Sequence, residues 1–158
     1  MSSPYQRLGR LLGIDMGEKR IGLALSDPTQ TLAQAHSILQ RTSRTADFAA
    51  IQTIVQEQTV VGLVIGLPQQ PDRPDDAKIA WIQDYGHELS QTLQLPLTFW
   101  DEAFTTRQAA NSLRARGRKA KQQKDRLDAV AAAFILQDYL DAQAPTPPLP
   151  EDFPYETY

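Results

Sequence analysis

The sequence predicts one α/β domain built on a mixed five-stranded sheet, in which three antiparallel strands are followed by parallel βα units, with helices flanking the sheet. Three observations predict this class. The chain has 158 residues, which is enough for one domain with one core. Near the start, two apolar runs flank a glycine-containing turn, a pattern typical of a β-hairpin. Further along, short apolar runs alternate with stretches of helical spacing, which predicts βα crossovers.

The stretch 10–27 predicts the hairpin on which the rest of the sheet is built. Its first strand ends at Asp15 and its second covers residues 21–25. A carboxylate that ends an apolar strand is costly to desolvate alone, so we expect Asp15 to meet water, a cation or a hydrogen-bond donor. Gly17 is expected to permit a positive φ in the turn. An ordinary hairpin with an acidic cap fits this stretch equally well.

The middle of the chain continues the sheet. Residues 31–39 are expected to add a third antiparallel strand, although their alternation is weak. Residues 45–58 have apolar side chains at helical spacing and predict a helix. Residues 60–65 are apolar on both faces, as is typical of a buried parallel strand, and residues 66–68 end it. The polar stretch 69–76 predicts an exposed loop at the carboxyl end of that strand.

A second βα unit is predicted next. A helix is expected to begin at Asp75 or Asp76, and Trp81 is expected to pack at its edge. Its apolar stripe consists of Ile79, Ile82, Tyr85, Leu89 and Leu93. Residues 95–100 then predict a short strand that stops at Asp101-Glu102, so a second strand ends in carboxylates.

The last part of the domain is expected to be helical. Thr105 or Thr106 is predicted to cap a helix that ends near residue 115, and a final helix is predicted over residues 125–141. The apolar face of the final helix consists of Leu127, Val130, Ala131, Phe134, Ile135 and Leu136. Residues 1–9 are expected to be an extension, 10–142 the domain, and 143–158 a Pro-rich tail with little order.

The charge of the chain is unevenly distributed. Seven of the sixteen basic residues lie within residues 114–126, which we call the basic segment, with Asp125 as its one acid. These residues are Arg114, Arg116, Arg118, Lys119, Lys121, Lys124 and Arg126. The segment therefore carries +6, and the rest of the chain −9, because the total is −3. A solvated loop is the commonest role of such a run; contact with a phosphate backbone is the functional alternative.

Several classes of site are excluded by composition. The chain has no cysteine, which excludes disulfides and thiolate metal sites and fits a reducing compartment. His36 and His87 are too few and too scattered for a histidine zinc site. No apolar stretch approaches the roughly 20 residues that span a bilayer, and residues 1–9 lack a signal-peptide core. We therefore expect a cytoplasmic protein that does not contact membranes.

Three acidic residues are expected to meet at one edge of the sheet. Asp15 and Glu102 end strands, and Asp128 lies in the opening turns of the final helix, close to its apolar face. Like charges within a few ångströms repel one another, so such a cluster needs protons or a metal ion. Mg²⁺ or Mn²⁺ is expected, because two such ions about 3.5–4 Å apart can activate water and stabilise the leaving oxygen in phosphodiester cleavage.

Each acid also has a simpler interpretation. Asp128 could cap its helix and favour the N-terminal dipole end, and Glu102 could be a surface loop residue. Three acids at three sheet-end positions beside one basic segment shift the balance towards nuclease chemistry.

At four places the sequence resembles the YqgF family, whose members are described as Holliday junction resolvases and as nucleases that mature the precursor of small-subunit ribosomal RNA. The matching residues are Gly13-Ile14-Asp15-Met16-Gly17 with Ile21-Gly22, then Val64-Ile65-Gly66-Leu67-Pro68, Asp101-Glu102 with Thr105-Thr106, and Leu127-Asp128-Ala129-Val130-Ala131-Ala132. The resemblance covers about residues 10–140. It implies a ribonuclease H-like fold, divalent-metal catalysis and catalytic carboxylates at Asp15, Glu102 and Asp128.

Two stretches depart from the family pattern. The family commonly follows the strand glutamate with Arg and then Ser or Thr, whereas Ala103 and Phe104 follow Glu102 here. Arg107 is the candidate for the phosphate contact of that arginine. The loop 69–74 lacks the small glycine-containing turn of the family, which puts substrate handling at that edge in question.

The sequence is compatible with three functions. The first is a metal-dependent nuclease acting on precursor RNA or branched DNA, as a monomer or weak homodimer, in which the three acids hold the metals. Its phosphate contacts would come from Lys19, Arg20, Arg107 and the basic segment. The second is a nucleic-acid-binding factor without turnover, whose acids are structural caps. The third starts from the likeness of residues 13–17 to the phosphate-binding hairpin of actin-like kinases, but those enzymes need two lobes and this chain has the length for one.

Overall fold

A computed structural model describes residues 9–68, 76–101 and 120–143, and for residues 76 and 120–128 it describes the backbone alone. Several predictions lie outside these ranges: the loop 69–74, the helix expected at 105–115 and the tail. Glu102, Arg107 and the first part of the basic segment, residues 114–119, also lie outside them.

The described strands form one sheet with the order β3-β2-β1-β4-β5. The strands are β1 (Arg10–Met16), β2 (Arg20–Ser26), β3 (Ala33–Gln40), β4 (Val60–Leu67) and β5 (Leu97–Asp101). β1 pairs with β2 and β2 with β3 in antiparallel orientation, whereas β4 pairs in parallel with both β1 and β5. The prediction of a mixed five-stranded sheet is therefore confirmed, and β1 is its central strand.

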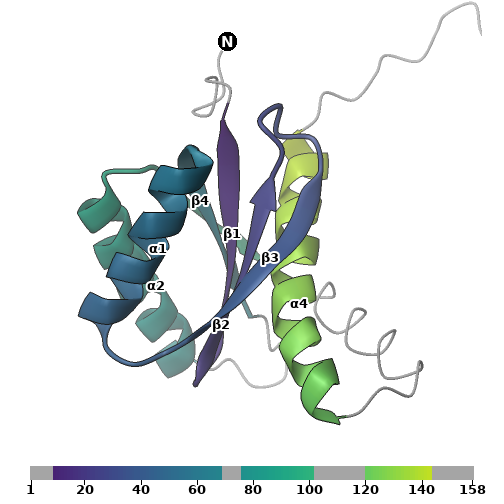
Figure 1. Ribbon diagram of the computed structural model, residues 1–158. Helices are drawn as coiled ribbons and strands as arrows, with labels where there is room; N and C mark the ends of the chain where they lie inside the picture. Colours follow the sequence, from purple (N-terminus) through teal and green to yellow (C-terminus); the bar gives the residue numbers. More distant parts are fainter. Residues whose placement is uncertain (1–8, 69–75, 102–119, 144–158) are drawn as a thin grey trace, which may run out of the picture.

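Helices cover both faces of this sheet. They are α1 (Arg44–Gln58), α2 (Asp76–Leu93) and α4 (Ala120–Gln143). α1 and α2 lie on one face and α4 lies on the other, running along the sheet (Figure 1). Each face has its own buried apolar cluster, and alternate residues of β1 supply both, with Leu12 and Ile14 towards α1 and α2 and Leu11 towards α4.

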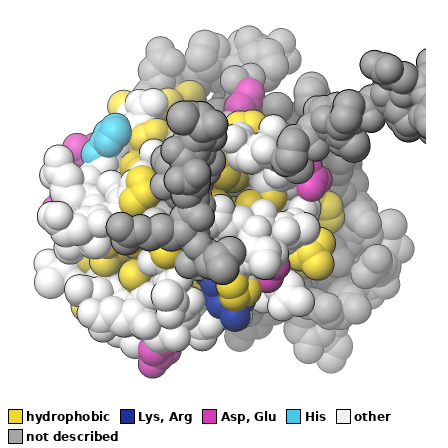
Figure 2. Space-filling model, turned by 90° about the horizontal axis from the view of Figure 1, so that it is seen from above, with side chains coloured by type: hydrophobic (Ala, Val, Ile, Leu, Met, Phe, Trp, Pro, Cys, Tyr) yellow, Lys and Arg dark blue, Asp and Glu magenta, His cyan; other side chains and the backbone are white. Residues whose placement is uncertain are grey.

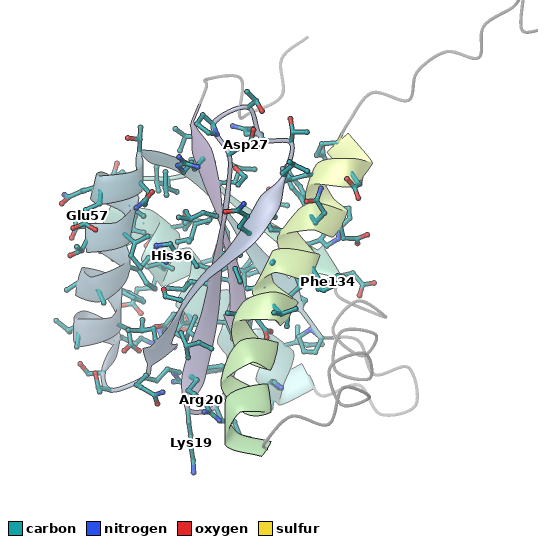
Figure 3. All side chains as sticks on the ribbon, turned by 45° about the vertical axis from the view of Figure 1, so that its right-hand side comes forward. Lys19, Arg20, Asp27, His36, Glu57 and Phe134 are labelled. Carbon is teal, nitrogen blue, oxygen red and sulfur yellow. The ribbon has the colours of Figure 1, made fainter. Side chains whose placement is uncertain are left out.

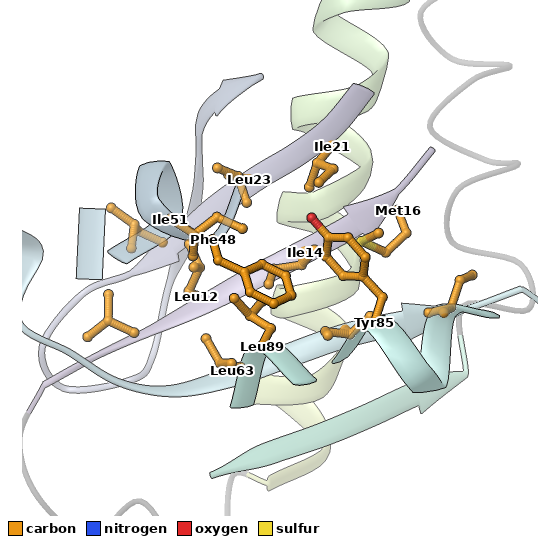
Figure 4. Packing of buried hydrophobic residues seen from close by; sticks show 14 residues of the cluster. Leu12, Ile14, Met16, Ile21, Leu23, Phe48, Ile51, Leu63, Tyr85 and Leu89 are labelled. Carbon is orange, nitrogen blue, oxygen red and sulfur yellow. The ribbon is translucent and has the colours of Figure 1, made fainter. Parts of the chain in front are cut away.

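The cluster under α1 and α2 is centred on Tyr85. Its ring meets Phe48 edge-on at a centroid distance of 5.1 Å and packs in the same cluster as Leu12, Ile14 and Leu89 (Figure 4). The Tyr85 hydroxyl donates a hydrogen bond of 3.0 Å to the buried carboxylate of Asp47. Burial, together with the negative charge of Asp47, raises the pKa of Tyr85, so the hydroxyl keeps the proton that it donates.

The predicted apolar face of the last helix is correct only in part. Ala131, Ile135 and Leu136 are buried against the sheet, but Phe134 is 46% exposed. The buried stripe instead continues through Tyr139 and Leu140, which follow the helical spacing from Leu136 more closely. The start of the helix is also wrong: α4 begins at Ala120, so Lys121, Lys124 and Arg126 are helical residues.

Ser43 caps the first helix, and replacing it should weaken the fold measurably. Its side chain accepts a hydrogen bond of 3.1 Å from the amide of Ala46. We expect Ser43→Ala to lower the free energy of unfolding by about 0.5–2 kcal/mol, because one amide of the first turn loses its acceptor. Urea denaturation measures this loss. Ser43→Gly is the control and should cost only a few tenths of a kcal/mol, since Gly also suits the cap position; equal losses would contradict the assignment.

Candidate active site

The carboxyl ends of the three parallel strands lie at one edge of the sheet. In the register of the ladder, Ile14 of β1 is level with Ile65 of β4, and Ile65 is level with Phe99 of β5. One residue further along, Asp15 is therefore level with Gly66 and Trp100. Edges of this kind are where α/β sheets place ligand sites, because the connecting loops leave a crevice there.

Asp15 faces the side of the sheet that α4 covers. Side chains alternate along a strand, and its neighbours Ile14 and Met16 belong to the cluster under α1 and α2. Asp15 is half-buried and is paired across the strand with Gly22 of β2. Its carboxylate is therefore placed at the boundary between the core and the open edge, as the sequence predicts.

At Gly13, β1 lies close against α4. A Cβ added at Gly13 would lie 2.8 Å from the Cβ of Leu136 and 3.1 Å from the carbonyl oxygen of Ala132. From this point both elements run to the same edge, β1 forwards and α4 backwards towards its first residue (Figure 1). Asp15 is about 7 Å further along the strand, and position 128 is about 6 Å further along the helix axis. The backbone at 128 thus reaches the level of Asp15.

Asp128 does not cap its helix. The helix begins at Ala120, eight residues before Asp128, so the first-turn amides and the dipole end are not within its reach. The interpretation of Asp128 as a cap is therefore wrong. The position of its side chain, like that of Glu102, lies outside what the structure describes.

Two predicted phosphate ligands lie at the same end of the β1–β2 hairpin as Asp15. Lys19 is exposed in the turn between β1 and β2, and Arg20 begins β2. Figure 3 shows both at the end of the sheet opposite Asp27, with Lys19 extending away from the molecule. Arg20 precedes Gly22 by two residues and so shares the face of the sheet on which Asp15 lies.

Gly17 is required in this turn for a different reason from the one expected. Its φ lies outside the left-handed region, but a Cβ at this position would lie 2.6 Å from the carbonyl oxygen of Arg20. That oxygen accepts a hydrogen bond of 2.9 Å from the Gly17 amide, so it cannot retreat without opening the turn. Gly17 is thus required because it has no side chain, and not because it adopts an unusual backbone conformation.

On the face of the sheet that α1 and α2 cover, cationic and aromatic side chains support the same turn. This group was not predicted from the sequence. The guanidinium of Arg41 lies over the ring of Trp81, 4.4 Å from its centroid, and donates from one nitrogen to the carbonyl oxygens of Gly17 and Glu18. Trp81 is half-buried beside Tyr85, as expected of a residue at the helix edge. No sequence signal linked Arg41 to the turn, because its acceptors are backbone atoms.

The end of the sheet opposite Lys19 and Arg20 has a hollow. A cavity of about 450 Å³ is lined there by residues that include Arg10, Asp27 and His36. Asp27 is occupied by the turn, because it accepts hydrogen bonds from the amide of Leu32, the hydroxyl of Thr29 and the amide of Thr31, which lower its pKa. Figure 2 looks onto this end, and the described Lys and Arg side chains form no broad patch in that view.

Of the three predicted metal ligands, the structure describes the side chain of Asp15. Among the residues with described side chains, no group of three or more His, Cys, Asp or Glu residues could hold a metal ion. Asp15 is a hard oxygen donor at a strand end, which suits Mg²⁺ or Mn²⁺.

No helix in the described parts of the chain is long and apolar enough to cross a membrane.

Comparison with solved structures defines the class of fold. The chain is similar to RuvC from Thermus thermophilus in complex with a Holliday junction substrate, with a TM-score of 0.53 and 15% identity over 85% of this chain and 95% of that chain. A second structure of Thermus thermophilus RuvC has a TM-score of 0.51 at 15% identity. The fold is thus ribonuclease H-like, as the resemblance implied.

Sequence comparison then gives the family. The family model described as "RuvX: Holliday junction resolvase" matches residues 9–142. A protein of Syntrophomonas wolfei named "Putative pre-16S rRNA nuclease" is 39% identical over 132 residues, which cover 84% of this chain and 94% of that protein. A protein of Paracoccus denitrificans with the same name is 37% identical over 135 residues, 85% of each chain. The chain therefore belongs to the RuvX family, also called YqgF.

Proposed function

We propose that this protein is a metal-dependent nuclease that hydrolyses phosphodiester bonds in structured nucleic acid and processes the 5′ end of precursor 16S rRNA. Membership of the RuvX family and the names of the relatives from Syntrophomonas wolfei and Paracoccus denitrificans support the reaction class and the RNA substrate. Asp15 at the carboxyl edge of the central strand supports it independently, because that is where a hydrolytic centre can form.

The proposed catalytic groups are Asp15, Glu102 and Asp128. The close contact of Gly13 with α4 supports the pairing of Asp15 with Asp128, because ideal strand and helix geometry then brings the backbone of position 128 to the level of Asp15. Position 128 also lies four residues before the buried Ala132, on the side of α4 that meets the sheet. Glu102 follows Trp100 by two residues in the sequence, and the side chain of Trp100 packs against the cluster under α4.

The residues present fit a hard divalent ion, because carboxylates are the ligands that Mg²⁺ and Mn²⁺ prefer. Asp15, Glu102 and Asp128 would hold the metals, which supply a Lewis acid and an activated water when bound. Asp15 would hold its carboxylate in a fixed position, because its strand is paired on both edges. Lys19 and Arg20 would hold phosphates beside it, and Arg107 with the basic segment would extend that contact.

Titration with Mg²⁺ and Mn²⁺ tests the proposal against the alternative of a binding factor without turnover. We expect cleavage that rises with metal concentration and stops on chelation. The substrates are a 16S precursor RNA fragment and a four-way DNA junction of equal nucleotide number, each with a linear duplex as control. Salt-sensitive binding to all of them without cleavage at any metal concentration would favour the binding factor.

A Holliday junction resolvase is the second candidate, and the description of the family favours it. Symmetric paired cuts in the four-way junction, with the precursor RNA left intact, would select it. Cleavage of the precursor at its 5′ extension, with the junction left intact, would select the RNA enzyme. The oligomeric state during cleavage distinguishes them as well, because symmetric cutting of a junction requires two active sites.

A further inference from the structure

We propose that Arg41 is a positioning residue that holds the turn between β1 and β2 in place and thereby presents Lys19 to the phosphates of the bound nucleic acid. This inference rests on the proposed function only for the identity of the ligand. Lys19 itself would contact the substrate, whereas Arg41 would act through the turn that carries it.

Arg41 binds three successive carbonyl groups of the turn. One guanidinium nitrogen donates to the oxygen of Gly17 at 3.1 Å and to that of Glu18 at 2.6 Å. The backbone amide of Arg41 donates to the oxygen of Lys19 at 2.9 Å. The fourth carbonyl of the turn, that of Arg20, accepts from Gly17 at 2.9 Å. Four consecutive carbonyl groups are thus occupied, so the backbone on both sides of the exposed Lys19 side chain is fixed.

The guanidinium is itself held in place by aromatic rings. It lies 4.4 Å from the centroid of Trp81 and 5.9 Å from that of Tyr85, and cation–π attraction favours both contacts. Tyr85 is in turn bound to Asp47, whose other oxygen accepts from the amide of Thr42 at 3.1 Å. The support therefore extends from the turn through α2 to the beginning of α1.

Arg41 is partly buried in this position. The Nε atom is buried and has no hydrogen-bond partner among the described groups. Leaving a buried donor without an acceptor is unfavourable. The two hydrogen bonds to the turn and the stacking on Trp81 offset this cost.

Arg41 and Asp15 approach the turn from different faces of the sheet. Met16, next to Asp15, belongs to the cluster under α1 and α2, where Trp81 also packs, while Asp15 faces α4. An opening of about 510 Å³ lies beside the turn on the Arg41 side, lined by Glu18, Arg41, Ala77, Lys78 and Trp81. Arg41 can therefore be replaced without removing any proposed catalytic group.

Arg41→Met is the test variant, because its unbranched apolar chain can still pack on Trp81 while the guanidinium donors are lost and the backbone amide of Arg41 still donates to Lys19. Arg10→Met is the matched control: Arg10 also donates to one backbone carbonyl of the same hairpin, that of Ser26 at 3.0 Å, but at the far end of the sheet. Both variants lose one positive charge. Arg41→Lys keeps the charge and one donor group and should restore part of the effect.

Amide hydrogen exchange gives the first readout. We expect exchange at Gly17 to become about tenfold faster in Arg41→Met, because the turn loses two side-chain hydrogen bonds. Arg10→Met should leave the exchange at Gly17 unchanged. Unchanged exchange in Arg41→Met would overturn the proposal whether or not the protein is a nuclease.

Binding of a fluorescein-labelled four-way DNA junction in calcium buffer gives the second readout. Lys19→Met should lower the slope of log K against log salt by about 0.7–0.9, the value of one lost phosphate contact. Arg41→Met should lower it equally, and the double variant should lower it no further, because both changes remove the same contact. Additive losses, or a parental slope in Arg41→Met, would overturn the proposal. If the unmodified chain binds no junction and no precursor RNA, the proposed function fails, and hydrogen exchange still decides whether Arg41 holds the turn.

Discussion

Asp15→Asn should reduce Mg²⁺- or Mn²⁺-dependent cleavage at least about a hundredfold, which corresponds to about 2.7 kcal/mol of transition-state stabilisation. The amide has nearly the shape of the carboxylate but lacks the charge that holds a divalent ion. Asp15 is half-buried at the end of the central strand, so the substitution removes a charge without removing packing. The rate of product formation at saturating metal measures the effect.

A surface acid far from the proposed site serves as the control for Asp15→Asn. Glu57 is exposed near the end of α1, away from Lys19 and Arg20 (Figure 3). Glu57→Gln should leave cleavage unchanged, and both variants should unfold within a few degrees of the parent. Undiminished cleavage by Asp15→Asn would remove the reaction centre from this edge of the sheet.

Leu12→Ala should lower the free energy of unfolding by about 2–5 kcal/mol, because Leu12 is fully buried between the sheet and α1 and a cavity would replace its side chain. The matched control is Leu32→Ala, the same chemical change at a residue that is 63% exposed, which should alter stability by less than about 0.5 kcal/mol. Urea denaturation of both variants measures the difference. Similar losses at the two positions would mean that β1 is not the centre of the core.

Most of the fold could be predicted because burial leaves a local pattern in the chain. The apolar run that forms β4 and the stripe of α2 with Ile82, Tyr85 and Leu89 were both visible in the sequence, and the structure buries them. The start of α4 was missed because Lys and Arg are good helix formers, yet their charge led us to expect a loop. Phe134 was assigned to the core by its apolarity, whereas the helical phase set by Leu136, Tyr139 and Leu140 leaves it exposed.

The candidate site could be predicted only where a side chain marks the end of an element. Asp15 was visible as the acid that closes an apolar strand. Arg41 was not, because its acceptors are the carbonyl oxygens of Gly17 and Glu18, and backbone atoms leave no trace in the sequence. Its stacking partner Trp81 is forty positions away along the chain, and only the packing of α2 on the sheet brings the two together.

The two tryptophans lie on opposite sides of the sheet, so their intrinsic fluorescence can report on the structure around each of them. The indole nitrogen of Trp100 donates a hydrogen bond of 2.7 Å to Asp138 of α4, and its ring meets Tyr139 edge-on. Trp81 lies across the sheet under Arg41. Emission from Trp100 therefore follows the docking of α4 on β5, and emission from Trp81 follows the state of the turn. In a Trp81→Phe or a Trp100→Phe variant one tryptophan remains, so movements on each side of the sheet can be followed without attaching a dye.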